Sequence, residues 1–448
     1  MFLGRLGKVK ARGWGREGER QTPRFAQTAG QKAESVPVGD RIQLARRGRF
    51  DYNPAARDVN ANSRNPGGSM ADDVLRIGID LSCLVPHPLT GVGYAASNYV
   101  RALIERGGPL ELRLFASSGR SAAHALEGFD GAAARRTAWW PTRLKTPMWT
   151  RLEWPPMERF TGPIDIAHGM FHLLPAARHA KRVVTVYDLT GLRFPETHTR
   201  RSTALHTAML SHAARRADAI VTMSQSCRND LVELLGAHPD RIHVVPGGVD
   251  LDEFSTPFDA GVRVRLGIPE TYFIYLGTIE PRKNLVRLIE AYAVVRDRLG
   301  EIPPLVIAGR PGWKTEAFDE AIERLKLGPQ LILVGYLPRA ETVMLLRGAM
   351  ACLYPSLYEG FGLPALEAMA AGVPLLTSNV SSLPEVVGDT ALMVEPESVE
   401  SIAAGIEELL AKPEAARVRA ERARARAETF TWGHSADILA AAYRNIAG

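Results

Sequence analysis

From residue 74 to the C-terminus, short runs of β-branched and apolar residues alternate with longer segments of helical periodicity. Parallel strands that helices cover on both faces show this pattern, because such strands are buried on both sides. A Pro-, Gly- and Asp-rich passage at 246–257 separates two sets of strands. The sequence therefore predicts an α/β protein with two doubly wound domains.

The first set of expected strands is 75–81, 111–116, 164–167, 182–187, 219–223 and 242–245, and the second is 272–276, 304–308, 330–334, 351–354, 374–377 and 391–394. Helices are expected at 95–105, 203–216, 285–299, 341–348 and 413–428, with an amphipathic segment after Phe430-Thr431-Trp432. The apolar face of that last segment needs a packing partner.

The first 69 residues are rich in Gly, Arg, Pro, Asn and Gln and have no sustained apolar period, so we predict a disordered extension. They hold fourteen Lys and Arg against six Asp and Glu, which leaves the remaining chain with a net charge of −2. We therefore expect no nucleic-acid partner for the folded part. A start at Met70, or a basic arm that touches anionic lipid or nucleic acid, is the alternative for this extension.

Two further features bear on the cellular setting. No apolar run is as long as a membrane span requires, since Pro364, Glu367 and Pro374 interrupt the most apolar stretch. The three cysteines lie far apart without a Cys-x-x-Cys pair, which argues against disulfides and zinc. A protein of the reducing cytoplasm is expected.

The stretch 355–372 places two glutamates around the start of an expected helix. Pro364 suits a first helical turn, so Glu359 falls in the preceding loop and Glu367 in the opening turns. A helix N-terminus attracts phosphate, and the loop glycines let the backbone approach a ligand closely. We infer a binding site for a diphosphate in which Glu367 accepts hydrogen bonds from the two hydroxyls of a ribose. Alternatively, Glu367 only complements the dipole of its helix and Glu359 is a solvated charge.

A second stretch, 275–285, runs from an expected strand through Gly277 to Arg282 and Lys283 at the start of a helix. In an open parallel sheet, ligands bind beyond the carboxyl ends of the strands, where these cations would lie. They would neutralise a leaving diphosphate. The alternative is a pair of cations on a wet surface.

Together the two stretches resemble the retaining glycosyltransferases with a Glu-x7-Glu pair, glycosyltransferase family 4 of the group 1 type. Glu359 and Glu367 have this spacing. Further similar segments, in the same order, are 90–94 (TGVGY), 245–250 (VPGGVD), 277–285 and 430–432 (FTW). The resemblance, from residue 75 onward, implies the GT-B fold, in which two Rossmann-like domains face one another across a cleft. It implies an acceptor domain at 70–255, a donor domain at 256–429 and a last segment, 430–448, that crosses back to the first domain.

The resemblance also implies roles for individual residues. Arg282 and Lys283 would hold the donor diphosphate, Glu367 the ribose, and Glu359 the sugar or a phosphate. Further donor contacts would come from Gly277, Phe361, Gly362 and Leu363, and from Gly91 and Gly93 of the other domain.

Three positions depart from the family pattern. Thr278 stands where many members carry Arg, which suggests that the first cation has moved to Arg282, and Gly247 replaces a commoner Asn before the linker. Tyr187 stands where many members carry a histidine, so Tyr187 and Asp188 become candidates for contacts with the sugar or the acceptor.

The missing imidazole has a candidate in His168, which ends another strand of the first domain. His172 is a weaker candidate. The alternative for His168 is a structural histidine that is satisfied by hydrogen bonds.

In the retaining mechanism that the resemblance implies, the acceptor hydroxyl approaches the face from which the diphosphate departs. Cations and helix N–H groups stabilise the charge that grows on the diphosphate. No cofactor and no metal are expected, although Asp250 and Asp252 form an Asp-x-Asp triplet that in other transferases binds a divalent ion. In the linker this triplet more simply forms a turn.

The expected partners are a nucleotide-sugar donor, with GDP-mannose favoured, and a glycan or lipid-linked acceptor. The expected activity is that of a hexosyltransferase. A sugar-nucleotide epimerase of the same fold and a non-catalytic carbohydrate-binding protein are the alternatives. A nicotinamide dehydrogenase fits less well, because Gly91 and Gly93 follow the first strand too late and the next strand lacks an acidic end.

Four of the seven tryptophans lie within residues 139–154, interleaved with Arg143, Lys145 and Arg151. Aromatic and basic residues of this kind suit peripheral contact with the inner face of the plasma membrane or a lipid-linked acceptor. They equally suit a packed helix with a proline-rich loop.

Overall fold

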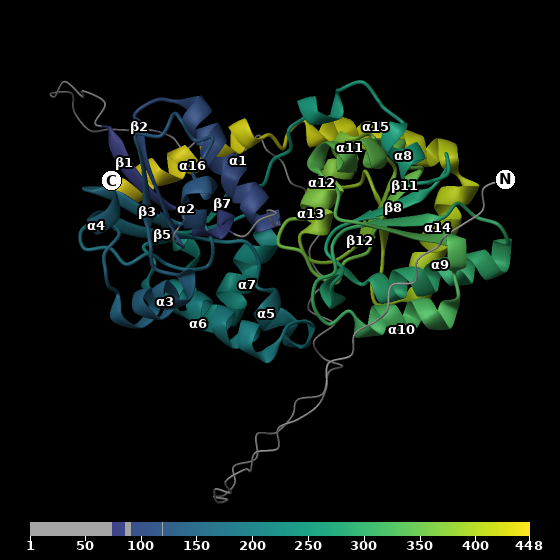
Figure 1. Ribbon diagram of the computed structural model, residues 1–448, viewed down its shortest axis with the longest axis horizontal. Coiled ribbons are helices and arrows are strands. Elements are labelled where there is room, and N and C mark those ends of the chain that lie inside the picture. Colours follow the sequence, from purple (N-terminus) through teal and green to yellow (C-terminus); the bar gives the residue numbers. More distant parts are fainter. Residues whose placement is uncertain (1–73, 86–90, 119) are drawn as a thin grey trace, which may run out of the picture. The chain divides into compact units, whose positions relative to one another are not determined.

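The structure is a computed structural model of the chain, and it describes residues 74–85, 91–118 and 120–448. The extension expected at 1–69 lies outside these residues, and so does Thr90. Within the described residues, two parallel sheets follow one another along the chain (Figure 1). This confirms the predicted α/β fold with two doubly wound sheets.

The N-terminal sheet has seven parallel strands in the order β3-β2-β1-β4-β5-β6-β7. Their bounds are Leu75–Asp80 (β1), Leu110–Ser117 (β2), Ala134–Ala138 (β3), Ile166–Gly169 (β4), Lys181–Val186 (β5), Ala219–Thr222 (β6) and Ile242–Val244 (β7). In the centre of the sheet, Ile77 pairs with Leu112 on one side and with Ile166 on the other. The edge strand β3 was not predicted.

The C-terminal sheet has six parallel strands in the order β10-β9-β8-β11-β12-β13. Their bounds are Phe273–Leu276 (β8), Leu305–Ala308 (β9), Leu331–Gly335 (β10), Ala351–Tyr354 (β11), Leu375–Ser378 (β12) and Leu392–Val394 (β13). The strand order reverses between β1 and β4 in the first sheet and between β8 and β11 in the second. Ligands of such sheets bind at these switch points, beyond the carboxyl ends of the strands.

The helices of the N-terminal part are Gly91–Arg106 (α1), Arg120–Ala125 (α2), Thr142–Pro147 (α3), Glu158–Thr161 (α4), Thr190–Arg193 (α5), Arg200–Arg216 (α6) and Gln225–Leu235 (α7). Those of the C-terminal part are Gly261–Arg265 (α8), Leu285–Leu299 (α9), Glu316–Leu325 (α10), Arg339–Gly348 (α11), Leu363–Ala370 (α12), Leu383–Val387 (α13), Val399–Ala411 (α14), Pro413–Ala427 (α15) and Trp432–Ala447 (α16). Side chains of Thr199, Ser224, Ser398 and Thr431 accept N–H groups at the starts of α6, α7, α14 and α16.

Helices cover both faces of the C-terminal sheet. Helix α9 packs with α10 and α14, whereas α12 packs with α13 and α15. Figure 1 shows α11 and α12 on one side of the strands and α9 and α10 on the other. A ligand at the switch point of this sheet therefore has α12 on one side and the start of α9 on the other.

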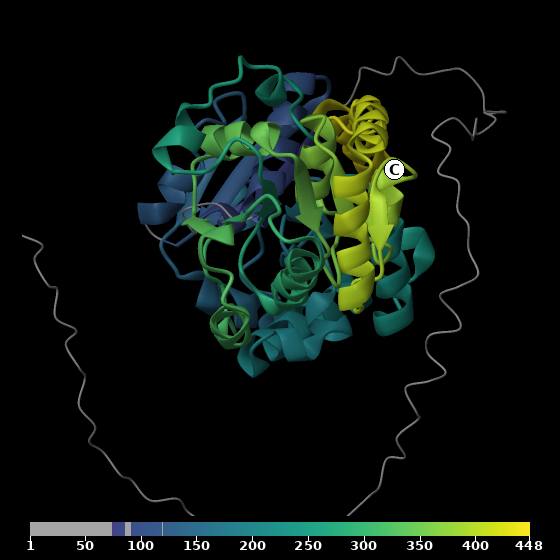
Figure 2. The same cartoon turned by 90° about the vertical axis from the view of Figure 1, so that its right-hand side faces the viewer.

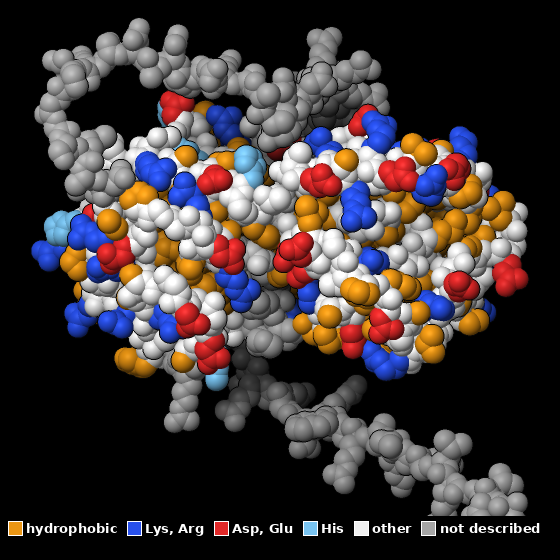
Figure 3. Space-filling model, turned by 90° about the horizontal axis from the view of Figure 1, so that it is seen from above, with side chains coloured by type: hydrophobic (Ala, Val, Ile, Leu, Met, Phe, Trp, Pro, Cys, Tyr) orange, Lys and Arg blue, Asp and Glu red, His pale blue; other side chains and the backbone are white. Residues whose placement is uncertain are grey.

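The last helix, α16, packs against α1 (Figure 1). Figure 2 shows the molecule with its C-terminal part toward the viewer. The rings of Tyr99 and Trp432 meet edge to face at 5.2 Å, and Arg106 forms an ion pair with Asp437. The apolar side of the amphipathic C-terminal segment thus has its partner on the N-terminal sheet. On the face drawn in Figure 3, Lys and Arg are interspersed with Asp and Glu, so no large basic patch forms there.

Candidate functional site

The segment after β8 ends in a 3-10 turn, Pro281–Lys283, that carries the two predicted cations. Asn284 closes the turn with a φ of +62°, in the left-handed region that asparagine tolerates better than most residues. Its buried amide donates hydrogen bonds to the carbonyl oxygens of Pro355 (2.9 Å) and Pro396 (2.6 Å). These bonds tie the turn to the segments after β11 and β13, so both cations lie at the carboxyl edge of the sheet, beside its switch point.

Glu359 contacts both cations. Its Oε2 lies 2.7 Å from Nη1 of Arg282, and its Oε1 lies 2.7 Å from Nζ of Lys283. The Tyr354 hydroxyl donates to the same Oε1 at 2.7 Å, and Nη2 of Arg282 forms a second ion pair with Glu280 at 2.7 Å. We call these five residues the Glu359 cluster. Three of the predicted catalytic residues therefore converge, as their positions at the ends of neighbouring strands implied.

The Glu359 cluster is buried and its charges balance. Burial alone would raise the pKa of Glu359, but Arg282 and Lys283 lower it to about 2. Burial and the neighbouring Arg282 lower the pKa of Lys283, although Glu359 opposes this shift. Two cations and two carboxylates compensate one another, so an anionic ligand would compete with Glu359 and Glu280 for the cations.

Helix α12 begins directly after this cluster, with Pro364 in its first turn as predicted. Gly362 precedes the helix with a φ of +97°, which few other residues adopt. A Cβ on Gly360 would lie 1.9 Å from the carbonyl oxygen of Tyr187, so only glycine permits this close approach of the N-terminal part. The ring of Phe361 is buried against Phe430.

Glu367 belongs to a second group. Its Oε1 lies 2.5 Å from Nη1 of Arg339, the first residue of α11. Arg339 also forms an ion pair with Glu253 at 2.7 Å, and its guanidinium lies 5.0 Å from the centre of the Tyr94 ring. Tyr94 follows Gly91 and Gly93, which were expected in a loop before the helix at 95–105 but instead form the first turn of α1. The segment of these glycines therefore meets the C-terminal part through the contact of Tyr94 with Arg339.

His168 lies in the interior of the N-terminal sheet. Its side chain is completely buried, and its ring nitrogens hydrogen-bond the hydroxyls of Tyr443 (2.6 Å) and Thr185 (2.9 Å). Burial lowers its pKa to about 3, so the ring is neutral at physiological pH. The structure thus does not bring His168 to the Glu359 cluster, and the position corresponds to the structural alternative.

Tyr187 and Asp188 follow β5 beside the Glu359 cluster. Burial would raise the pKa of Asp188, but Arg282 and His172 lower it. The carboxylate accepts a hydrogen bond from the N–H of Thr190 at 3.0 Å. Nε2 of His172, the weaker histidine candidate, accepts the N–H of Tyr187 at 3.2 Å. Asp188 therefore senses the charge of Arg282, whereas His172 supports the backbone next to it.

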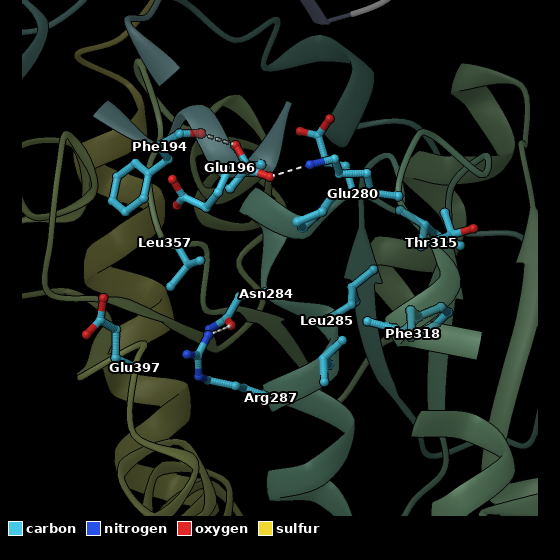
Figure 4. Close-up of a pocket in the computed structure, with 16 residues that line it drawn as sticks. Phe194, Glu196, Glu280, Asn284, Leu285, Arg287, Thr315, Phe318, Leu357 and Glu397 are labelled. Carbon is cyan, nitrogen blue, oxygen red and sulfur yellow. Dashed lines mark hydrogen bonds between the residues drawn. The ribbon is translucent and has the colours of Figure 1, made fainter. Parts of the chain in front are cut away.

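A cavity of about 350 Å³ adjoins the cluster on the α9 side (Figure 4). Three residues of the N-terminal part line it, Phe194, Glu196 and Thr197. The C-terminal part contributes residues 279–281 and 284–287, Lys314, Thr315, Ala317, Phe318, Leu357 and Glu397. Glu280 lines the cavity and belongs to the Glu359 cluster. The cavity and the cluster are therefore contiguous.

Several of these residues could not be read from the sequence motifs. Tyr354 and Glu280 lie at or just after the ends of β11 and β8, so their position relative to the strands is a usable signal. Arg339 follows β10 in the same manner, but its partner Glu253 comes from the linker. Asp250 Oδ1 accepts the N–H of Asp252 at 3.0 Å, which is the turn expected for the Asp-x-Asp triplet.

In the residues that the structure describes, no three His, Cys, Asp or Glu side chains are grouped so that they could hold a metal ion. None of the helices in this part of the chain is both long enough and apolar enough to span a bilayer.

Comparison with known proteins finds two adjacent family matches. Residues 263–426 match the model of the glycosyl transferases group 1, and residues 89–253 match that of glycosyltransferase family 4. The sucrose-phosphate synthase of Thermosynechococcus elongatus has a similar fold, with a TM-score of 0.66 and 19% identity over 83% of this chain and 99% of that one.

Curated relatives are more similar in sequence. The O-antigen chain mannosyltransferase B of Escherichia coli is 32% identical over 62% of this chain and 74% of its own length. The MMP alpha-(1->4)-mannosyltransferase of Mycolicibacterium hassiacum is 31% identical over 63% of this chain and 67% of its own length. With the two family matches and the two doubly wound sheets, these relatives show that the chain belongs to the group 1 glycosyltransferases of family 4.

Proposed function

We propose that this glycosyltransferase is a retaining hexosyltransferase that moves mannose from GDP-mannose to a hydroxyl of a glycan or lipid-linked acceptor. The paired cations Arg282 and Lys283 at the switch point are the observation that carries this proposal. The names of the two mannosyltransferase relatives support mannose as the sugar. The proposed partners are therefore the donor GDP-mannose and the glycan or lipid-linked acceptor.

In the proposed reaction, the bond between the anomeric carbon and the diphosphate breaks while the acceptor oxygen bonds to the same face of that carbon. The acceptor proton passes to an oxygen of the departing diphosphate, so no protein nucleophile, cofactor or metal is needed. Arg282 and Lys283 stabilise the growing negative charge, together with the N–H groups at the start of α12. Glu367 accepts hydrogen bonds from the ribose diol, and Glu359 orients the sugar.

Thermal unfolding with GDP-mannose, UDP-glucose, UDP-N-acetylglucosamine and dTDP-rhamnose tests the donor, because a ligand that binds only the native state raises its stability. We expect GDP-mannose to raise the Tm most. Proton NMR of the product with an acceptor then tests retention of the anomeric configuration. Conversion of the donor to an epimer without any acceptor would contradict the proposal.

We further propose peripheral contact with a membrane surface through residues 139–154. The side chains exposed there are Trp139 (84%), Leu152 (69%), Trp154 (53%) and Leu144 (49%), whereas Trp140 and Trp149 are buried. Arg151 of the same segment is exposed, whereas Lys145 is buried in an ion pair with Asp80. Such aromatic and basic side chains suit the interface of an anionic bilayer.

Flotation with vesicles that contain anionic lipid tests this contact. We expect the wild-type protein to float and the double variant Trp139→Ser, Trp154→Ser to remain at the bottom. The control is Phe258→Ser, which changes another exposed aromatic residue. Equal flotation of all three proteins would contradict a role for this segment.

A further inference from the structure

The cavity beside the Glu359 cluster has the side chains of a site for an uncharged polar ligand. Phe194 and Leu357 supply apolar surface, and Glu196 and Glu397 supply exposed carboxylates (Figure 4). Among the residues that the structure describes, neither of these two carboxylates forms an ion pair. Lys314 and Arg287 add two cations, so charges of both signs line the cavity. A sugar ring fits this chemistry, because its C–H faces pack on apolar groups and its hydroxyls donate to carboxylates.

Only the ion pair between Glu280 and Arg282 separates the cavity from the proposed diphosphate-binding site. Glu280 lines the cavity and holds Arg282 at 2.7 Å. Glu367, the proposed ribose ligand, lies on α12, whereas α9 and α10 border the cavity from the opposite side of the strands (Figure 1). An occupant of the cavity would therefore reach the cations from the side away from the nucleoside.

Contacts from the C-terminal part fix the wall of the cavity formed by Phe194, Glu196 and Thr197. Trp313 Nε1 donates to the carbonyl oxygen of Thr197 at 2.7 Å, and Lys314 Nζ donates to that of Glu196 at 2.6 Å. The Trp313 ring also stacks on His198, with centres 5.4 Å apart. These contacts hold the N-terminal and the C-terminal sides of the cavity in place before a ligand binds.

We propose that this cavity is the acceptor site and that it takes the uncharged sugar units at the growing end of a glycan. This inference rests on the proposed function. The acceptor hydroxyl would then meet the anomeric carbon beside Arg282, and its proton would pass to the diphosphate oxygen that this guanidinium holds. Three carboxylates, those of Glu196, Glu280 and Glu397, line the cavity against two cations, which disfavours a phosphorylated acceptor terminus.

The full-length protein, saturated with GDP, is titrated with α-linked mannobiose as the probe. The double variant Glu196→Gln, Glu397→Gln removes two carboxylates without changing side-chain size, and Ala317→Trp fills the cavity from an exposed position of α10. Glu320→Gln, exposed on the same helix, is the matched control. Protection by GDP-mannose against thermal unfolding is measured for each protein.

We expect the dissociation constant for mannobiose to rise by about tenfold or more in both cavity variants and to stay within about twofold in the control, while donor protection is retained. Unchanged mannobiose binding in the cavity variants would overturn the assignment, as would tighter binding of mannose 6-phosphate than of mannobiose. A wild-type protein that no nucleotide sugar protects would contradict the proposed function instead. Even if no nucleotide sugar protects the wild type, weaker mannobiose binding in the cavity variants would still support the cavity as a saccharide site.

Discussion

Nζ of Lys283 lies 2.7 Å from Oε1 of Glu359, and less than a tenth of either side chain is exposed. The same carboxylate holds Arg282 through its other oxygen. Glu359 therefore forms ion pairs with both cations that we assign to the donor diphosphate. A bound diphosphate has to share Arg282 and Lys283 with Glu359 or displace its carboxylate.

Removal of one of these cations should slow the proposed transfer. We expect Lys283→Met to lower kcat by about 100- to 1000-fold, the usual loss when one preorganised group that stabilises developing charge is removed. Initial rates with GDP-mannose and an acceptor measure this. Lys412→Met, at an exposed position, is the control, and Tm values identify any loss of folding. A kcat close to the wild-type value would show that Lys283 does not stabilise the leaving group.

The charge of Glu359 should make stability depend on acid. Its folded pKa of about 2 lies below the ordinary value of 4.5, so the folded state binds the proton more weakly. The stabilisation is complete above pH 4.5 and is lost as the pH falls from 4.5 towards 2, with a slope of up to about 1.4 kcal/mol per pH unit. Urea unfolding of the wild type and of Glu359→Gln should therefore differ most above pH 4.5. A difference that is independent of pH would count against this coupling.

Glu367 should decide the affinity for the ribose. Two charge-assisted hydrogen bonds to a diol predict a loss of about 10- to 100-fold in donor affinity for Glu367→Gln. A 2′,3′-dideoxy analogue should bind the variant and the wild type equally, because it lacks the diol. Glu323→Gln, exposed on α10, is the control. If the variant keeps its preference for the natural ribose, Glu367 only pairs with Arg339.

His168 and Tyr443 should couple the last helix to the N-terminal sheet. Burial lowers the pKa of His168 to about 3 in the folded state, whereas the ordinary value is 6.5. Below pH 6.5 the unfolded state therefore binds a proton that the folded state does not bind. Stability from the neutral ring is thus full above pH 6.5 and falls as the pH drops towards 3. His168→Gln should flatten this part of the pH profile.

A double-mutant cycle with Tyr443→Phe measures the same contact at pH 8. For residues in direct contact we expect a coupling of about 0.5 kcal/mol or more between the two substitutions. Additive effects, with an unchanged pH profile for His168→Gln, would mean that the hydrogen bond does not link α16 to β4.

The sequence predicts the inner strands well because strands buried on both faces are continuous apolar runs, as in β8 and β11. The edge strand β3 contains Arg135, Arg136 and Thr137, all exposed, so its sequence lacks this signal. Arg282 and Glu359 lie 77 residues apart, yet their meeting could be predicted, since parallel neighbouring strands end at one edge.

Contacts set by distant helices could not be predicted in this way. Arg339 reaches Glu367 on α12 from the start of α11, and Tyr443, near the other end of the chain, hydrogen-bonds His168. A strand-end position alone suggested that His168 faces a ligand. The roles assigned to the individual site residues stay predictions.

The most direct test compares GDP with GMP, or the matching nucleotides of whichever donor protects the protein, by calorimetric titration of the wild type and of Lys283→Met. If Lys283 and Arg282 hold the diphosphate, the wild type binds GDP more tightly than GMP, and the variant loses about tenfold or more of this preference. The same preference in both proteins would contradict a diphosphate-binding site at these cations.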